Sequence, residues 1–388
     1  MEFAFSEEQK MFLAMFEDFS TNEIAPIAED LDHEETPPHD VLRKAAQQGF
    51  LGATLPEAYL GAELDFVSYA LLVESLARDC VSIAVMLGSH VSLVAMSVLE
   101  HGTDAQKEAF LPLLASGGAG RTGVRLGGFA LTEPDAGSDT TALRTRAVRD
   151  NGDYLVDGLK TWVTNGEIAG LFLVFAEAEE GLSAFLIPAD TPGLTVGYRE
   201  PTLGLRNAPF NTIYLEGCRV PAANLLGKEG HGQAIAERAQ QRLAITLGAA
   251  GLGVSADSLD VALQFATERI QFGVPIAEKQ AIQNYVAESA VEMEALRYLT
   301  YHAAWLIDQG NDVRFDASVV KAFGAQVARN VTNRMVQVMG GYGYMEDYPM
   351  ARKYRDARGL GIIGGPTELH HVRIAQELFS EWDVRIEP

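Results

Sequence analysis

The fold class follows from a stretch in the middle of the chain, residues 154–175, which read YLVDGLKTWVTNGEIAGLFLVF. Three short β-rich runs lie in this stretch, at 154–156, 161–164 and 171–175, and Asn165-Gly166 is a turn signal between two of them. Similar runs follow at 184–187, 194–196 and 212–215. Because no helical pattern separates these runs, they predict an antiparallel β-sandwich or barrel of roughly 100 residues and not a Rossmann fold.

Helical patterns flank the β-rich part on both sides. Apolar residues recur at helical spacing before it at 12–19, 67–77 and 81–99, and after it at 234–265, 280–308 and 315–339. The chain is therefore expected to be an α+β protein, mostly α, with the order helical, β, helical. The predicted domains are an N-terminal helical domain at 1–122, a β-domain at 123–231 and a C-terminal helical domain at 232–388.

The composition excludes several classes of protein. Among 388 residues, 53 are acidic and 30 are basic, which gives a formal net charge of −23 and argues against nucleic-acid binding. A hydrophobic content of 47% excludes intrinsic disorder. Cys80 and Cys218 are the two cysteines, too few for a disulfide framework and not clustered with histidine, so no metal site is expected. With no signal peptide and no apolar run of about 18 residues in the sequence, a cytoplasmic protein without a membrane span is predicted.

Two clusters in the β-rich part carry side chains suited to a flat polar ligand. FALTEPDAGSD at 129–139 places Thr132, Gly137 and Ser138 after apolar strand residues, where hydroxyls and amides can meet a heterocycle edge or a phosphate. A simple Pro-Asp turn is the alternative. KTWVTNG at 160–166 places Trp162 beside Thr164, which can stack on a ring and hydrogen-bond to it, and a core tryptophan is the alternative.

Two more clusters lie in the C-terminal part. ERIQFGVP at 268–275 puts Arg269 before Phe272, which suits a pyrophosphate or a ring edge, although arginine is also favoured at any helix C-terminus. QVMGGYGY at 337–344 contains Gly340-Gly341, which allows the backbone to approach a ligand closely. Each cluster alone is weak, but the four in this order on a helical–β–helical chain are specific.

Taken together, the clusters resemble the acyl-CoA dehydrogenase family over essentially the whole chain. The resemblance is carried by TEPDAGSD at 132–139, TWVTNG at 161–166, ERIQFGVPI with the later Gln280, QVMGGYGY at 337–344 and RDAR at 355–358. It implies that the C-terminal domain is a four-helix bundle and that the protein is a homotetramer or a dimer of dimers. It also implies non-covalent FAD as cofactor and an acyl-CoA substrate.

The resemblance also assigns roles to individual positions. FAD would be bound by Phe129, Leu131, Thr132, Gly137, Ser138, Trp162, Thr164, Arg269, Phe272, Gln280, Gln337, Gly340, Gly341, Thr367 and Glu368. Of these, Arg269, Phe272 and Gln280 contact the ADP part across a subunit interface in family members. The substrate site would consist of Ser138, Gln241, Arg242 and Gly365, with Arg242 fixing the long helix beside the thioester.

The chain departs from the family at the catalytic base. Most relatives carry a glutamate directly before the glycine of the last loop, and that position is Gly364 here. Other relatives carry it directly before the arginine of the long helix, and that position is Gln241. An amide cannot take a proton at neutral pH, so both usual base positions lack a carboxylate and the catalytic residue is unassigned.

Three explanations follow from this departure. A base could come from the segment near 85–95, but only His90 there titrates near pH 7, and a structural role for it is favoured. A desulfinase-like elimination needs no base, but the arginine that such relatives use to hold the anion is replaced by Val85. The third is a catalytically silent flavin-binding partner subunit, or an enzyme for a carrier-bound acyl thioester.

Partners and access follow the same resemblance. A dehydrogenase of this kind would normally pass electrons to an electron-transferring flavoprotein, and direct reaction with oxygen is the alternative. The Gly-rich loop 116–125, with Arg121 and Arg125, is expected either to shape access to the site or to be a tolerated surface insertion.

Overall fold

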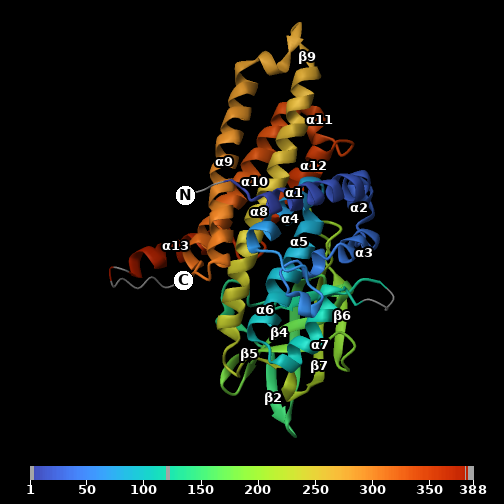
Figure 1. The fold of residues 1–388 in the computed structure, drawn as a ribbon, viewed down its shortest axis with the longest axis vertical. Helices are drawn as coiled ribbons and strands as arrows, with labels where there is room; N and C mark the ends of the chain where they lie inside the picture. Colours follow the sequence, from blue (N-terminus) through green and yellow to red (C-terminus); the bar gives the residue numbers. More distant parts are fainter. Residues whose placement is uncertain (1–3, 119–122, 381, 383–388) are drawn as a thin grey trace.

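The structure is a computed structural model that describes residues 4–118, 123–380 and 382. Figure 1 shows the β strands at one end of the molecule, a small hairpin at the opposite end, and α8 extending along most of the length between them. The predicted order helical, β, helical is confirmed. Arg121 lies outside the described residues, and Arg125 donates its backbone N–H to the Gly117 carbonyl at 2.9 Å.

The N-terminal part is helical. Its main elements are α1 (Glu7–Phe19), α2 (Ala28–Glu34), α3 (His39–Gln47), α4 (Phe66–Asp79), α5 (Val81–Gly88), the π-helical η5 (Ser89–Ala95), α6 (Met96–His101) and α7 (Asp104–Ala115). The predicted helix at 81–99 is therefore interrupted by a π-helical segment that begins at Ser89. Such segments are frequent at functional sites, because they rotate the side chains that follow.

The central part is an eight-stranded sheet. Its strands are β1 (Leu126–Ala130), β2 (Arg146–Asp150), β3 (Asp153–Thr164), β4 (Ala169–Ala178), β5 (Gly181–Pro188), β6 (Leu194–Arg199), β7 (Phe210–Val220) and β8 (Leu225–Leu226). The order is β6-β7-β3-β2-β4-β5-β8, with β1 paired to β4. The pairings are antiparallel as predicted except that β1 and β2 both run parallel to β4. The runs 154–156 and 161–164 belong to one strand, β3, with irregular pairing between Lys160 and Val163.

The C-terminal part is helical again. Its elements are α8 (Gly232–Glu268), the hairpin β9 (Ile270–Gln271) and β10 (Val274–Pro275), α9 (Gln280–Asp308), α10 (Arg314–Met339), α11 (Gly341–Tyr344), α12 (Pro349–Gly359) and α13 (Thr367–Ser380). Helix α10 contacts α8, α9 and α13, so the long helices pack side by side. The Gly- and Ala-rich sequence of α8 permits this packing. A Cβ on Gly248 would lie 2.2 Å from Val320 Cγ1 of α10, and one on Gly253 would lie 2.1 Å from the Glu74 carbonyl of α4.

One apolar stretch is longer than the sequence indicates. Val81–His101, 21 residues long, would suffice to cross a membrane by length and composition alone, although serines and His90 interrupt its apolar residues. The whole of its most apolar window is buried inside the protein. Among the residues that the structure describes, the stretch is therefore packed as a core segment between the sheet and α8.

Candidate functional site

A cavity of about 640 Å³ lies where the three parts of the chain meet. Its walls come from η5, from β1 and β3 with the loop at 202–205, from α8, and from the segment that joins α12 to α13. The cavity brings together many residues predicted from the sequence: Phe129, Leu131, Thr132, Gly137, Ser138, Trp162, Thr164, Gly364 and Gly365. Residues from three separate parts of the sequence, near 129–138, 162–164 and 364–365, thus line one space.

The backbone at Thr132 is held from the side opposite the cavity. Lys160 is buried and donates from Nζ to the Leu131 carbonyl at 2.9 Å and to Glu133 Oε1 at 2.7 Å. The N–H and C=O of a trans peptide point in opposite directions, so the Thr132 N–H points away from Lys160. In the described part of the chain this N–H has no acceptor, while the Thr132 carbonyl accepts from the Thr161 N–H at 2.9 Å. Thr132 therefore offers a backbone donor and a hydroxyl to a polar ligand edge.

Trp162 lies on the cavity wall in an unusual backbone conformation. Its φ is +55°, in the left-handed region that non-glycine residues rarely adopt, and it falls at the irregular pairing of β3 with β7. Its side chain is 57% exposed although it lies on a strand. The irregular pairing turns the indole out of the sheet, where its face is free to stack on a planar ring.

Two side chains hold the turn at Gly364-Gly365, which lines the cavity. Gly364 and Gly365 have φ values of +72° and +99°, which glycine adopts without strain. His370 Nε2 lies 3.1 Å from the Gly364 carbonyl, and Lys321 Nζ donates to the Gly365 carbonyl at 3.0 Å. Burial lowers the pKa of His370 to about 3, with the charge of Lys321 adding to the shift, so the ring is neutral and Nε2 is the donor.

The two usual base positions differ in their placement. Gly364 lines the cavity, and a Cβ built on it would lie 3.2 Å from Leu243 Cδ2 and 3.3 Å from Leu247 Cδ1 of α8. Gln241 does not line the cavity, and its Oε1 accepts from Arg238 at 3.5 Å. Gln240 lines it instead and accepts from Arg373 Nη2 at 3.3 Å. Sequence reasoning missed Gln240 and Arg373, because the family motif singles out only the residue next to Arg242.

Arg242 holds α8 in place from outside the cavity. The side chain is fully buried and does not line the cavity. It donates to the Ser92 carbonyl and to Ser97 Oγ, both at 3.0 Å, and pairs with Glu100. Arg242 therefore ties α8 to η5 and α6 and does not itself line the cavity.

His90 can be excluded as a base that opens into the cavity. It is fully buried, does not line the cavity, and accepts at Nδ1 from the Gly127 N–H at 2.8 Å. Burial lowers its pKa to about 4. The structural role that the sequence favoured is the one this geometry fits.

The electrostatics of the cavity are the reverse of the protein's overall charge. Among the described residues that line it, there is no aspartate, glutamate, histidine or lysine, but there are three arginines: Arg355, Arg358 and Arg373. Burial lowers the pKa of Arg373, which means that its charge is poorly solvated. No side chain in this lining can act as a general base at neutral pH.

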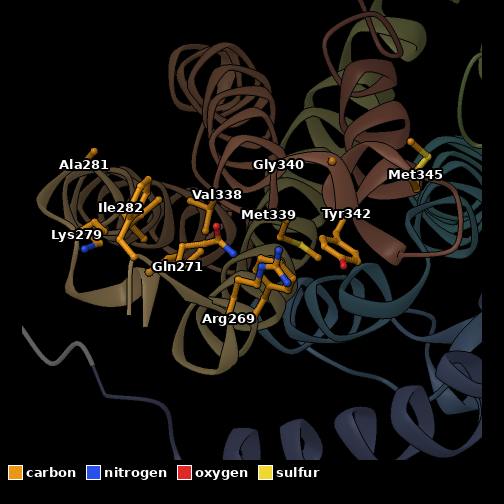
Figure 2. Close-up of a pocket in the computed structure, with 14 residues that line it drawn as sticks. Arg269, Gln271, Lys279, Ala281, Ile282, Val338, Met339, Gly340, Tyr342 and Met345 are labelled. Carbon is orange, nitrogen blue, oxygen red and sulfur yellow. The ribbon is translucent and has the colours of Figure 1, made fainter. Parts of the chain in front are cut away.

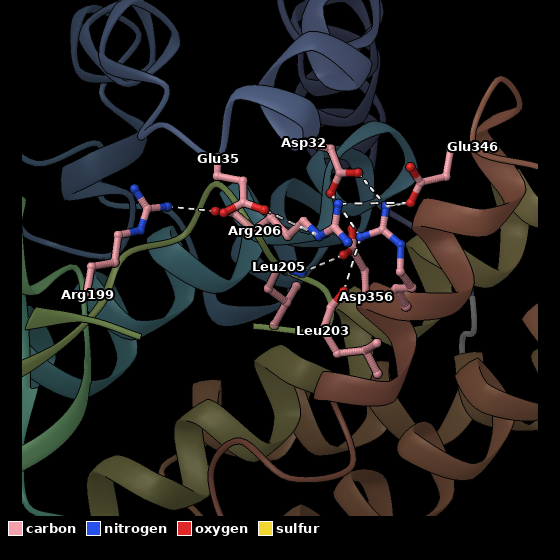
Figure 3. Close-up of polar contacts among 9 residues, drawn as sticks. Asp32, Glu35, Arg199, Leu203, Leu205, Arg206, Glu346 and Asp356 are labelled. Atoms are coloured by element: carbon pink, nitrogen blue, oxygen red, sulfur yellow. Dashed lines mark hydrogen bonds and ion pairs between the residues drawn. The ribbon is translucent and has the colours of Figure 1, made fainter. Parts of the chain in front are cut away.

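The loop at 202–205 is fixed to the cavity by a buried ion network (Figure 3). Arg355 pairs with Asp32 of α2 and donates to the Leu203 carbonyl at 3.2 Å. The Leu205 N–H, in a residue with φ +58°, donates to Asp356 Oδ1 at 2.6 Å. Burial raises the pKa of Asp356 to about 6. The RDAR motif thus positions one wall of the cavity through Arg355 and Asp356.

A second cavity of about 790 Å³ lies at the far end of α8, beside the β9–β10 hairpin (Figure 2). Arg269, Phe272, Gly340 and Gly341 line it, and the Arg269 guanidinium lies 5.4 Å from the centre of the Tyr342 ring. A Cβ on Gly340 or Gly341 would meet nothing within 4 Å, so the backbone there is open to a ligand. Phe272 is 94% exposed. The second cavity therefore presents a guanidinium group, aromatic rings and exposed backbone to a ligand.

Four of the residues predicted to bind FAD line neither cavity. These are Gln280 at the start of α9, Gln337 near the end of α10, and Thr367 and Glu368 at the start of α13. The two cavities share no lining residue, so one copy of the chain does not bring the Arg269 cluster and the Thr132 cluster to a single ligand. The family resemblance had already indicated a contact of Arg269 and Phe272 across a subunit interface.

The residues present fit FAD. The first cavity offers the unpaired Thr132 N–H, the exposed Trp162 ring and the Thr164 hydroxyl to an isoalloxazine. The second offers Arg269 and the open backbone at Gly340-Gly341 to a diphosphate or an adenine. Both sets match the donor and stacking chemistry of a flavin dinucleotide.

Three family models match the chain. They are the acyl-CoA dehydrogenase N-terminal domain at residues 6–118, the middle domain at 128–218 and the C-terminal domain at 230–379.

Individual relatives match over nearly the full length. The chain is similar to an acyl-CoA dehydrogenase of Bacillus subtilis, with 39% identity over 97% of this chain and 99% of that protein. It also resembles the structure of butyryl-CoA dehydrogenase from Megasphaera elsdenii, with a TM-score of 0.94, 34% identity, and 98% and 100% of the two chains covered. A chain in a structure of the electron transferring flavoprotein of Acidaminococcus fermentans matches with a TM-score of 0.94 and 36% identity, over 97% of this chain and 99% of that one.

Proposed function

The chain belongs to the acyl-CoA dehydrogenase family, whose cofactor is FAD, and from this premise we propose that it acts on the acyl group of an acyl-CoA thioester in the 640 Å³ cavity. The observation that carries the proposal is that two sets of residues, distant in the sequence, line this one cavity. Thr132, Trp162 and Thr164 line the same cavity as the held turn at Gly364-Gly365. We propose that a thioester bound in this cavity has its α and β carbons next to the flavin ring that Thr132, Trp162 and Thr164 would hold.

Bound FAD would supply the acceptor for the hydride that leaves the acyl β-carbon. The residues of this chain would bind FAD and the thioester and orient them relative to each other. Thr132 would hydrogen-bond the polar edge of the ring, Trp162 would cover its face, and Ser138 would lie between ring and pantetheine. Arg269, Phe272 and Gly340-Gly341, which lie in the separate cavity, would contact the ADP part of a neighbouring subunit's FAD.

The acid–base chemistry is the atypical part of the proposal. Dehydrogenation needs loss of an α-proton, and no cavity-lining residue in the described part of the chain is a carboxylate or a histidine. We therefore propose dehydrogenation with an atypical or missing base, which predicts a slow reaction when the α-proton of the substrate is not unusually acidic.

The lack of a carboxylate or histidine among the described residues that line the cavity also favours a second candidate function, which needs no proton abstraction. That candidate is either a base-independent elimination or a flavin-binding partner subunit without its own catalysis. A desulfinase-like elimination is the weaker form, because Val85 stands where an anion-holding arginine would be, and it is buried in the core.

The test is an anaerobic titration of the purified FAD protein with short, long, branched and cyclic acyl-CoAs. Bleaching of the flavin absorbance by any of them supports dehydrogenation. Spectral perturbation without bleaching supports binding without oxidation, as in the second candidate. A protein that neither retains nor can be reconstituted with FAD would contradict both candidates.

The remaining expectations are also proposals. The domain boundaries are placed at 122/123 and 231/232, between the last helix or strand of one part and the first of the next. A homotetramer or dimer of dimers would complete each FAD site from two chains. The electron acceptor would be an electron-transferring flavoprotein, and the compartment the cytoplasm. A carrier-bound thioester is the alternative to acyl-CoA.

A further inference from the structure

A buried ion pair lies directly behind the cavity wall at Thr132. Lys160 and Glu133 are both buried, and Lys160 Nζ donates to Glu133 Oε1 at 2.7 Å. The same Nζ donates to the Leu131 carbonyl at 2.9 Å. Leu131 and Thr132 both line the cavity of about 640 Å³. The ammonium group of Lys160 is therefore in contact with the peptide that joins these two lining residues.

The peptide between Leu131 and Thr132 connects the ion pair to the cavity. Its carbonyl accepts from Lys160, and its N–H, on Thr132, has no acceptor in the described part of the chain. The two groups of a trans peptide point in opposite directions, so this N–H points away from the ion pair and is left for a ligand. Hydrogen bonds in such a chain polarise one another, and a charged donor on the carbonyl makes the N–H a stronger donor.

The other two buried lysines among the described residues have no such connection. Lys321 Nζ donates to the Gly365 carbonyl, but the next residue is Pro366, whose nitrogen carries no hydrogen. Lys353 donates to a carbonyl of α4, pairs with a carboxylate of α8 and lines neither of the two cavities. Lys160 is thus distinguished by a peptide N–H that can carry the effect of its charge to a ligand.

Both members of the pair carry their charges near neutral pH. Burial lowers the pKa of Lys160 to about 8, although the Glu133 carboxylate opposes this shift. Burial acts to raise the pKa of Glu133, but hydrogen bonds from Lys160 and Thr145 outweigh it, so this pKa lies below its ordinary value. The carboxylate also accepts from the Arg144 and Thr145 N–H groups at 2.7 and 3.0 Å. The pair is thus a fixed dipole whose positive end contacts the Leu131 carbonyl.

A dipole in this place acts on a ligand more than on the stability of the fold. Because desolvation offsets the attraction between two buried charges, a buried ion pair can often be replaced by apolar residues without loss of stability. A charge next to a cavity wall, by contrast, changes the binding free energy of a ligand whose own charge distribution changes. The polar edge of an isoalloxazine ring is such a ligand, since it gains electron density on reduction.

From these contacts we infer that Lys160 is a positioning residue, held by Glu133, that favours the reduced over the oxidised form of FAD through the Thr132 N–H. The inference rests on the proposed function, because it needs the polar edge of the ring at Thr132. A stronger N–H donor binds the electron-rich reduced ring more tightly, which makes hydride transfer from the acyl β-carbon to bound FAD more favourable. Without the Lys160 charge, the ratio of the dissociation constants of oxidised and reduced FAD should fall by about tenfold, which is about 30 mV for a two-electron couple.

The experiment measures the two-electron reduction potential of the FAD-loaded protein, anaerobically and at pH 6.5, where Lys160 carries its charge. Lys160→Met combined with Glu133→Gln leaves no unpaired charge in the core and is expected to lower the potential by about 30 mV. Lys160→Met alone leaves the carboxylate behind the site, so its potential should be lower still. The control, Lys353→Met combined with Asp257→Asn, removes a buried ion pair away from both cavities and should keep the wild-type potential.

FAD content and unfolding temperature, measured on each variant, separate the two proposals. A Lys160 double variant with full FAD content and the wild-type potential would overturn the inference and leave the proposed function intact. An equal fall in the control would also overturn it, since the effect would then belong to any buried ion pair. A folded double variant that no longer binds FAD would overturn it as well, because the pair would then shape the site and not set the ratio. The single variant gives the same decision where the double variant is unstable. A wild-type protein that cannot be loaded with FAD would overturn the proposed function and the inference with it.

Discussion

Gly364 shows how one residue restricts the chemistry of the site. Its backbone is left-handed, and its missing Cβ leaves room next to Leu243 and Leu247. Position 364 therefore lacks the family's carboxylate and has a backbone conformation that suits glycine. A glutamate placed there is expected to supply a base and, at the same time, to lower the stability of the fold.

Gly364→Glu is expected to cost about 1–2 kcal/mol of stability from the left-handed backbone and to raise dehydrogenation of a saturated acyl-CoA by about 10²–10⁴-fold by supplying a base. Flavin bleaching rates in the FAD-loaded protein measure the second effect. Gly364→Ala carries the same strain without the carboxylate and is the matched control. Equal rates in the two variants, both with full FAD content, would show that the missing base does not limit the reaction.

Gln241→Glu gives a further contrast at the residue scale. Because Gln241 does not line the cavity and contacts Arg238, a carboxylate there is expected to leave the bleaching rate close to that of the wild type. A large increase would mean that α8 rotates when substrate binds.

His370 makes stability depend on pH. Its pKa is about 3 in the folded protein, against an ordinary value of 6.5, so the unfolded chain binds the proton more readily between these values. The contribution of His370 is present above pH 6.5 and is lost as the pH falls, by about 2 kcal/mol between pH 6.5 and pH 5. Urea unfolding at pH 5, 6 and 7.5 should show a smaller loss in His370→Gln, which keeps a donor for the Gly364 carbonyl, than in the wild type. The loss that remains in the variant includes that of buried His90, whose pKa is also lowered, to about 4. His39→Gln, at an exposed position, should keep the wild-type dependence.

At the scale of elements, α8 connects the site to the rest of the fold. Its cavity face carries Gln240 and Leu243, Arg242 ties it to η5 and α6, and its glycines allow close contact with α4 and α10. The position of the cavity walls thus depends on how closely these helices approach.

Gly253→Ala tests that dependence. The new Cβ would lie 2.1 Å from the Glu74 carbonyl, a backbone atom that cannot move alone, so a loss of about 1–3 kcal/mol is expected. Gly251→Ala, whose Cβ would lie 3.1 Å from the Gly324 carbonyl, is the graded control and should cost less. Thermal unfolding of both variants decides the point, and equal losses would argue against tight α4–α8 packing.

At the scale of the whole molecule, the two separate cavities favour an assembly. The Arg269 cluster and the Thr132 cluster lie in different cavities of one chain, and Phe272 is exposed beside the first of these clusters. A dinucleotide that uses both clusters has to be shared between two copies.

Phe272→Asp is therefore expected to lower the FAD content per chain several-fold while the fold, measured by circular dichroism, stays intact. Light scattering would report the assembly at the same time. Met11→Asp, a substitution of another exposed apolar residue (67% exposed) on α1, is the control and should retain FAD. Full FAD occupancy in monomeric Phe272→Asp would contradict the shared site.

The sequence by itself determined the class of fold and the family, because alternating β runs between helical blocks and four ordered motifs are local patterns. It also determined that positions 241 and 364 lack a carboxylate. Only the tertiary structure decided which residues share a cavity: Gln240 and Arg373 in place of Gln241 and Arg242, a buried His90, and the pair of Lys160 and Glu133 behind Thr132. These depend on helix rotation and on contacts between distant segments, which local patterns do not specify. The contrast between a chain of net charge −23 and a cavity lined by arginines arises in the same way, since folding and not composition selects which side chains meet.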